Sequence, residues 1–174
     1  MGAWGALIMS FFGAFFASLT LYWQQHATGV VLLIPFLGFA LFAVLAVRLI
    51  RMPGTGIDPS PSEERAITWS TVAEAIGLFL ASNIVINLHR PDLLLPSLAL
   101  VVGLHFIPIA FAAGFRPFYV LGGSLVAIAA VTFAAGGQAG GTIAGLMSAG
   151  ALWIASSLAV RRDRRAKRAS QLGL

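Results

Sequence analysis

The sequence predicts an all-α, polytopic membrane protein: a bundle of six transmembrane helices with the N and C termini cytoplasmic. Hydrophobic residues make up 59% of the 174 residues and charged residues only 10%, and the mean hydropathy is +0.91, whereas soluble domains carry about a quarter charged residues. Six separate stretches reach the roughly 20 apolar residues that a membrane-spanning helix needs. Of the eleven Lys and Arg residues, all but Arg90 fall on one side of this topology, which is therefore predicted to be cytoplasmic.

Each predicted helix follows from its own apolar stretch. The single six-helix transmembrane domain covers residues 1–160, and its helices are expected at residues 3–23, 28–50, 67–88, 93–113, 117–135 and 142–160. The first stretch ends with Tyr22 and Trp23, which are typical of a membrane interface. The second stretch contains Pro35, and the fourth contains Pro96 and Pro108. Because proline removes a backbone hydrogen bond, Pro96 and Pro108 predict bends in the fourth helix.

The connections between the stretches carry their own signals. The longest, residues 51–66, is rich in Pro and Gly, which predicts irregular chain on the cytoplasmic side. Its last part, from Ser60 to Glu63, has the pattern of a capping box with Pro61 at the first helical position, so the third helix is expected to begin ahead of its apolar stretch. Between the last two stretches we expect a turn with four glycines, Gly136, Gly137, Gly140 and Gly141.

Two titratable residues lie inside the apolar stretches, Glu74 in the third and His105 in the fourth. A charge in the bilayer centre costs at least ~2.5 kcal/mol, so such residues require an explanation. At 1.5 Å per residue, both should lie roughly 10–12 Å from the cytoplasmic side. The short connection at residues 89–92 makes the two helices antiparallel neighbours. A Glu74–His105 contact is therefore reasonable, as a pair that shares or relays a proton or as a structural hydrogen bond between helices.

Asn83 and Asn87 are four residues apart and share one face of the third helix. They are candidates for lining a polar cavity that opens to the outer side, or else for hydrogen bonds between helices. Asn83 lies half a turn away from Glu74 around the helix. This offset argues against a single narrow pore lined by all three residues.

Small residues at four-residue spacing predict close packing of helices. Such pairs occur in the first helix (Gly13 and Ala17), in the third (Gly77 and Ala81) and at the start of the sixth (Gly141 and Gly145). These faces serve either the inside of the bundle or the contact between copies in a homo-oligomer.

A basic cytoplasmic tail is expected at residues 161–174. Its six cationic residues are Arg161, Arg162, Arg164, Arg165, Lys167 and Arg168. Because they directly follow an apolar stretch, they predict a topology determinant and a partner in anionic lipid headgroups, and not a nucleic acid. We place the protein in the plasma membrane, with the bacterial inner membrane as our guess.

The sequence offers no sign of an enzyme. It contains no cysteine, no nucleotide-binding loop, no nucleophile elbow and no zinc-protease motif. His26, His89 and Asp92 share no spacing that would predict a metal site, and no cofactor is expected. The leading hypothesis is transport or permeation of a small solute or proton that uses Glu74 and His105. The alternative is a non-catalytic membrane subunit or sensor that acts through helix packing, the cytoplasmic loop and the basic tail.

Overall fold

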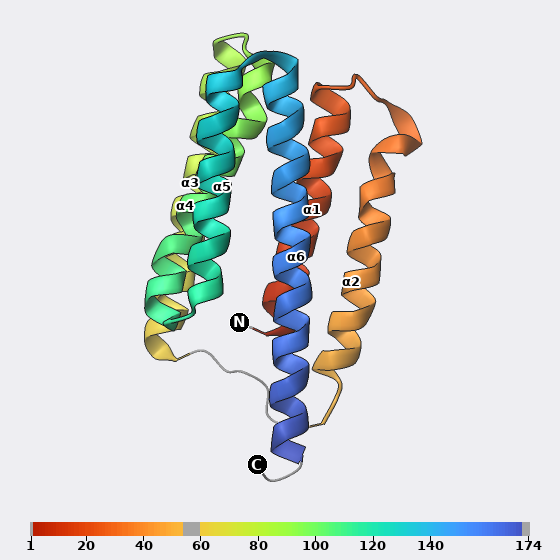
Figure 1. Ribbon diagram of the computed structural model, residues 1–174, viewed down its shortest axis with the longest axis vertical. Helices are drawn as coiled ribbons and strands as arrows, with labels where there is room; N and C mark the ends of the chain where they lie inside the picture. The colour runs from red at the N-terminus through yellow and green to blue at the C-terminus, as the bar shows by residue number, and fades with distance from the viewer. Residues whose placement is uncertain (1, 54–59, 172–174) are drawn as a thin grey trace.

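The computed structural model describes residues 2–53 and 60–171, and within these ranges every regular element is a helix (Figure 1). The α-helices are α1 (Ala3–Trp23), α2 (Ile34–Ile50), α3 (Pro61–Asn87), α4 (Leu94–Ala113), α5 (Arg116–Ala135) and α6 (Gly137–Gln171). Two short 3-10 helices, η1 (Gly29–Leu33) and η2 (Pro91–Leu93), lead into α2 and α4. Six helices are long and apolar enough to cross a membrane.

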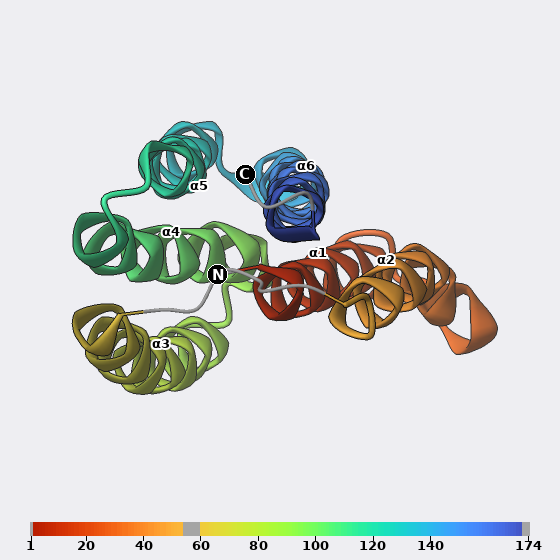
Figure 2. The ribbon, with the colours of Figure 1, turned by 90° about the horizontal axis from the view of Figure 1, so that it is seen from below.

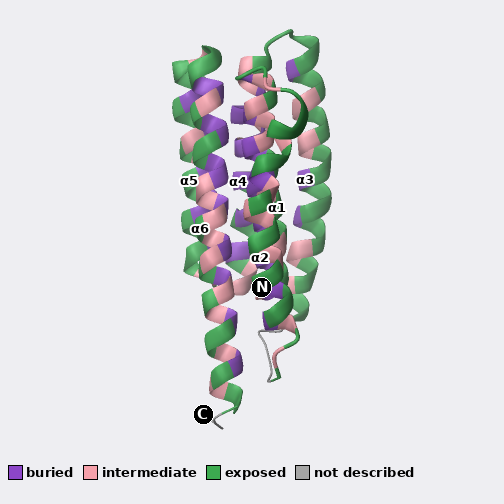
Figure 3. Ribbon diagram, turned by 90° about the vertical axis from the view of Figure 1, so that its right-hand side faces the viewer, coloured by how far each residue is buried: buried purple, intermediate pink, exposed green. Residues whose placement is uncertain are grey.

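The helices pack around α4 and α1. Figure 2 shows α4, α1 and α2 in one row, with α5 and α6 on one side of it and α3 against the opposite side of α4. The helices α2 and α3 therefore lie at the edges of the bundle, and each has only three buried residues. Figure 3 shows purple buried residues where the helices face one another and green exposed residues along α2 and α3. The molecule is therefore an open bundle in which α2 and α3 have the least contact with the other helices.

Both ends of the described chain lie at one end of the bundle, where α1, α3 and α5 begin and α2, α4 and α6 end (Figure 1). We call this the basic end. It carries ten of the eleven Lys and Arg residues: Arg48, Arg51, Arg65, Arg116 and the six cationic residues of α6. The eleventh, Arg90, lies in the turn between α3 and α4 at the opposite end.

The core lies where α1, α4, α5 and α6 meet. The largest side chains with almost no exposed surface are Phe16, Leu95, Ile109, Leu125 and Leu152. They come from these four helices. The core is therefore made largely by the helices other than α2 and α3, which lie at the edges of the bundle.

The start of α3 follows from the capping box that the sequence predicts. The Ser60 hydroxyl accepts a hydrogen bond from the Glu63 backbone N–H, and the Ser60 N–H donates to the Glu63 carboxylate, at 3.3 and 2.7 Å. Pro61 is the first residue of the helix, where its missing N–H has no cost. The helix therefore begins six residues ahead of the apolar stretch expected at residue 67, as the capping pattern predicted.

The prolines fall at different places in their helices. Pro35 and Pro96 lie in the first turns of α2 and α4, where a backbone N–H has no partner within the helix. The bend expected at Pro96 therefore has no basis, because this proline removes no helical hydrogen bond. Pro108 lies inside α4. It leaves the carbonyl of Leu104 without its usual N–H donor.

The turn between α5 and α6 is shorter than predicted. Only Gly136 and Gly137 form it, both with φ of +61°, a conformation that glycine adopts without strain. Gly140 and Gly141 already belong to α6 and are buried. A Cβ at Gly140 would lie 2.7 Å from the Thr132 carbonyl oxygen. These two glycines therefore permit close packing, and the prediction that they form the turn is wrong.

The basic segment after residue 160 continues α6 as helix to Gln171 and is not a separate tail. Ala, Arg and Lys are strong helix formers, and two buried charges one turn apart fix this segment to the bundle. Asp163 accepts a hydrogen bond from the Ala3 N–H at 3.2 Å, at the start of α1. The Lys167 ammonium donates, at 2.8 to 3.2 Å, to three carbonyl oxygens at the end of α2, those of Leu49, Ile50 and Met52.

Small residues bring α1 and α6 together. A Cβ at Gly145 would overlap the Thr20 hydroxyl, and a Cβ at Gly13 would lie 2.6 Å from the Trp153 indole nitrogen. The predicted small-residue faces of the first and sixth helices thus pack against each other within one chain. Of the two interpretations, these contacts support packing inside the bundle.

The closest backbone contact between α4 and α5 was not predicted. A Cβ at Gly103 would lie 2.9 Å from the Gly122 carbonyl oxygen, and one at Gly122 would lie 2.8 Å from the Gly103 carbonyl oxygen. The two backbones therefore touch at a pair of facing glycines. On α4, Ala99 lies four residues before Gly103, whereas on α5 no small residue lies four positions from Gly122.

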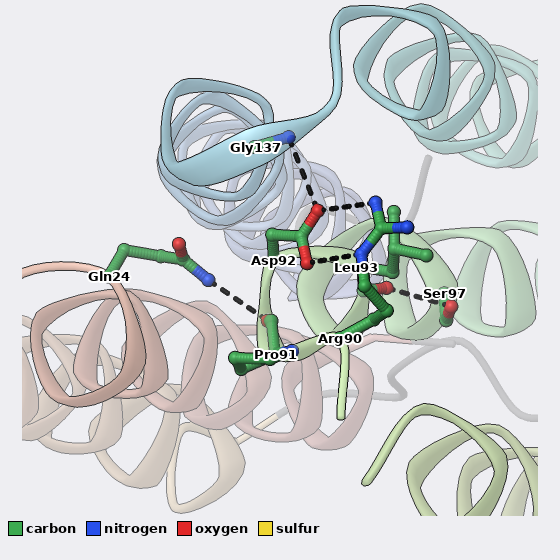
Figure 4. A network of polar contacts seen from close by, with 7 residues as sticks. All are labelled: Gln24, Arg90, Pro91, Asp92, Leu93, Ser97 and Gly137. Carbon is green, nitrogen blue, oxygen red and sulfur yellow. Dashed lines mark hydrogen bonds and ion pairs between the residues drawn. The ribbon is translucent and has the colours of Figure 1, made fainter. Parts of the chain in front are cut away.

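At the end opposite the basic end, a polar network joins α1, η2 and α6 (Figure 4). The Asp92 carboxylate accepts hydrogen bonds from the Arg90 guanidinium at 2.9 and 3.0 Å and from the Gly137 N–H at 3.2 Å. The buried Gln24 amide, at the end of α1, donates to the Pro91 carbonyl at 3.1 Å. Asp92 therefore satisfies a free N–H group at the start of α6.

Candidate functional site

Glu74 is the middle residue of α3, equally far from Pro61 and Asn87. It belongs to the narrow face of α3 that contacts α4, and it is buried although most of its helix is exposed. One turn along, Gly77 allows close approach, because a Cβ there would lie 2.8 Å from a methyl group of Val101 on α4. The sequence thus places an acid one turn from a tight contact between α3 and α4.

His105 faces Glu74 from α4. Its Nδ1 atom lies 3.5 Å from a carboxylate oxygen of Glu74, and the two side chains are only 10% and 9% exposed. Apart from this contact, the buried Nδ1 atom has no hydrogen-bond partner in the described structure. The backbone of Ser70, one turn before Glu74, also interacts with the imidazole. The structure thus brings together the two residues whose contact the sequence made reasonable.

A cavity lies on each side of the pair. The smaller, about 210 Å³, lies between α1, α3 and α4 and is bordered by Met9, Phe12 and Thr71 as well as by the pair. The larger, about 480 Å³, lies between α3 and α4. We call them the α1-side cavity and the α3–α4 cavity. Both have room for several water molecules, since one water occupies about 30 Å³ in the liquid.

Besides the pair, Ser70 contributes a polar side chain to the lining of the α3–α4 cavity. Leu104 and Pro108 also line it. Because Pro108 has no N–H, the backbone carbonyl of Leu104 lacks its helical donor. A carbonyl of this kind can accept a hydrogen bond from water or from a bound molecule. The bend predicted at Pro108 therefore lies next to the cavity that His105 borders.

The chemistry available to this arrangement is proton exchange. A carboxyl group and an imidazole can hold one shared proton as a neutral pair or as an ion pair, and the weak screening of a buried site makes the two forms sensitive to their surroundings. A separation of 3.5 Å needs only a small movement, or one bridging water, to become a hydrogen bond.

Asn83 and Asn87 are both exposed and do not join the pair. The Asn83 amide donates to the Phe79 carbonyl of its own helix at 2.8 Å. Asn83 also borders, with Ser82, a third cavity of about 420 Å³ near Trp23, whose other lining residues are apolar. Asn83 thus borders a largely apolar cavity, and neither Asn87 nor Glu74 is in its lining.

The six cationic residues of α6 are not equivalent. Lys167 is buried against the end of α2, and the Arg162 guanidinium lies 3.9 Å from the centre of the Phe115 ring. Four arginines are exposed: Arg161, Arg164, Arg165 and Arg168. Only these four have side chains free to meet lipid headgroups or solvent across most of their surface.

The histidines of the two turns opposite the basic end adopt the same unusual conformation. His26 follows α1 and His89 follows α3, with φ of 52° and 54°. Each precedes a 3-10 helix that leads into the next α-helix. Among the residues that the structure describes, no three His, Asp or Glu side chains lie close enough to hold a metal ion.

Comparison of the chain with protein-family models, with curated proteins and with solved structures finds no match.

Proposed function

We propose that this chain is a multi-pass membrane protein that carries protons, or a small solute coupled to protons, across the bilayer. Glu74 is the titratable group and His105 is its partner. The observation that carries the proposal is the position of this pair, in contact at the middle of α3 with a cavity on either side. Ionisable residues inside membrane-spanning helices are costly and mark proton or ion pathways.

In this proposal the basic end faces the cytoplasm, because Lys and Arg residues accumulate in cytoplasmic segments. Arg90 alone lies on the other side. The cell inner membrane of a bacterium is the location we propose. The six apolar helices agree with a multi-pass arrangement.

A proton would enter through water in one cavity, bind to the Glu74 carboxylate and leave through the other cavity. His105 would hold the proton in passing or stabilise the carboxylate through its charge. Asn83 and its cavity would form a separate vestibule near the outer side, since they do not border Glu74. For a coupled solute, the α3–α4 cavity is the larger of the two that the pair borders.

The test is proton flux into proteoliposomes after a pH jump, with wild type compared with Glu74→Gln. The substitution keeps the size of the side chain and removes its titration. We expect flux to fall roughly 100-fold, or to the level of empty vesicles, because acid–base groups contribute about that much to proton transfer. Glu64→Gln is the matched control, since Glu64 is an exposed acid at the start of the same helix.

The other outcomes are equally informative. Flux that is equal for wild type, Glu74→Gln and empty vesicles, with folding intact, would remove simple proton permeation. Flux that falls equally in Glu74→Gln and Glu64→Gln would remove the special role of the pair.

The alternative, a subunit or sensor that does not transport, was expected to associate through its small-residue faces. Gly13 and Gly145 pack inside the chain, which weakens this support. Part of the cytoplasmic loop of this hypothesis, residues 54–59, lies outside the described residues. The hypothesis would gain weight if the vesicles carry no flux and the protein depends on another protein for its stability in cells.

A further inference from the structure

Several arginines line a cavity at the basic end, which does not include Glu74. A cavity of about 500 Å³ is formed where α2 ends beside the extension of α6. Three arginines line it, Arg48 and Arg51 from α2 and Arg164 from α6. Its other walls are apolar and include Leu45 and Val160. Three arginine side chains thus line a cavity whose other walls are apolar.

The contacts of Lys167 join the two helices that form this cavity, α2 and α6. Its ammonium is buried and donates to the carbonyls of Leu49, Ile50 and Met52. Lys167 lies one turn after Arg164, so the same contacts hold Arg164 opposite Arg48. The Gln171 amide adds a hydrogen bond to the Pro53 carbonyl at 2.7 Å. The two walls of the cavity are therefore fixed to each other by polar contacts outside the hollow.

The three guanidinium groups are uncompensated. Among the described residues, no carboxylate forms an ion pair with Arg48, Arg51 or Arg164. The nearby acid on α6, Asp163, is directed instead to the N–H of Ala3 at the start of α1. Three positive charges around one cavity favour an anion, and guanidinium groups bind phosphate through paired N–H donors.

We propose that Arg48, Arg51 and Arg164 bind the phosphate group of an anionic phospholipid. A lipid fits better than a soluble phosphate because the cavity walls are apolar and the neighbouring surface of α2 is exposed and apolar, at Leu37 and Leu41. The acyl chains lie along this surface while the headgroup enters the cavity. Basic pockets between helices on the cytoplasmic side of a membrane are suited to such headgroups.

This site is more specific than the attraction of a basic tail to a charged membrane. It uses one arginine of the α6 extension and two from α2, which lie more than 100 residues earlier in the chain. It is also independent of proton movement at Glu74 and requires only that the helices lie in a bilayer.

The test is native mass spectrometry of the purified full chain in detergent with phosphatidylglycerol or phosphatidylcholine. We compare wild type with the triple variant Arg48→Gln, Arg51→Gln, Arg164→Gln. The matched control is Arg161→Gln, Arg165→Gln, Arg168→Gln, which removes the same charge from exposed residues outside the cavity. We expect the affinity for phosphatidylglycerol to fall roughly 100-fold in the first variant and to change little in the control.

A second variant guards against a loss of topology or folding. Arg48→Lys, Arg51→Lys, Arg164→Lys keeps all three charges but removes the paired donors, and we expect it to bind phosphatidylglycerol more weakly than wild type. Equal losses in the cavity and control triples would overturn the proposal in favour of general charge attraction. Equal retention of phosphatidylcholine and phosphatidylglycerol by wild type would overturn it as well.

The source of the phosphate is tested by competition with glycerol 3-phosphate and inorganic phosphate. We expect neither to displace phosphatidylglycerol at millimolar concentration, because they lack the acyl chains. Displacement by either, lost in the cavity triple, would show a site for a soluble phosphate and would overturn the lipid as the occupant.

Discussion

The α1–α6 interface and the α3–α4 interface both contain polar side chains between helices, but they use them differently. Between α1 and α6, the Ser156 hydroxyl donates to the Ala6 carbonyl at 2.8 Å, and the Trp153 indole donates to the Ser10 carbonyl at 3.2 Å. Between α3 and α4, Glu74 and His105 lie 3.5 Å apart without a hydrogen bond between them.

The helices around the two sets of polar side chains also differ in how tightly they pack. Along α1, ten of 21 residues are buried, whereas along α3 only three of 27 are. Gly13 in α1 and Gly145 in α6 leave no space for even a methyl group, while the Glu74–His105 pair has a cavity on each side. The first interface is built for stability. The second keeps ionisable groups beside open space, and our proposed function depends on this arrangement.

The largest expected effect is at the close contact of α1 and α6. Gly145→Val would force a side chain into Thr20, and we expect the free energy of unfolding to fall by roughly 3 kcal/mol. Gly150→Val is the control, because a Cβ at Gly150 meets nothing within 4 Å and the change in helix propensity from glycine to valine is the same at both positions. Reversible unfolding in mixed detergent micelles measures both. Equal losses would mean that the interface is not the tight one described.

The α3–α4 interface should respond in the opposite direction. Replacing Glu74 and His105 together by leucine removes a buried polar pair, and we expect the free energy of unfolding to rise by about 1 kcal/mol. Proton flux should be lost in the same variant. His105→Leu alone should lower stability, because it leaves the buried carboxyl group without its partner. A double variant less stable than wild type would indicate that the pair is a structural contact.

The smallest expected effect is at a single hydrogen bond of the α1–α6 interface. Ser156→Ala removes the bond to the Ala6 carbonyl, and bonds of this kind between membrane helices contribute about 0.6 kcal/mol on average. Ser124→Ala, at an exposed position of α5, is the control and should leave the unfolding free energy unchanged. A loss above that of Gly145→Val would reverse our ranking of packing over hydrogen bonding.

The sequence predicts well those features that depend on neighbouring residues. Apolar stretches give the six helices, and the capping box at Ser60 gives the start of α3. The contact of Glu74 with His105 could be anticipated because a very short turn joins their helices, which leaves little freedom in how the two pack.

Features that depend on which side chains of two helices face each other could not be predicted. Gly103 faces Gly122 on the next helix, but Gly122 has no small residue four positions away that would mark the contact. Lys167 looks like one more charge of a basic run, and only the fold shows that it binds the end of α2. Gly140 and Gly141 look like a turn, because their packing against Thr132 and Gln24 is not visible from composition.

The pairing of α1 with α6 also has a consequence for how the protein is made. About 110 residues separate the end of α1 from the start of α6, so at ribosomal rates α1 waits roughly 6 to 20 seconds for its main partner. During this interval its hydroxyls are not left without acceptors. Ser10 donates to the Leu7 carbonyl and Thr20 to the Phe16 carbonyl, both within α1. If the chain inserts into a bilayer as we propose, the first helix enters alone and receives the last one without exchanging these hydrogen bonds.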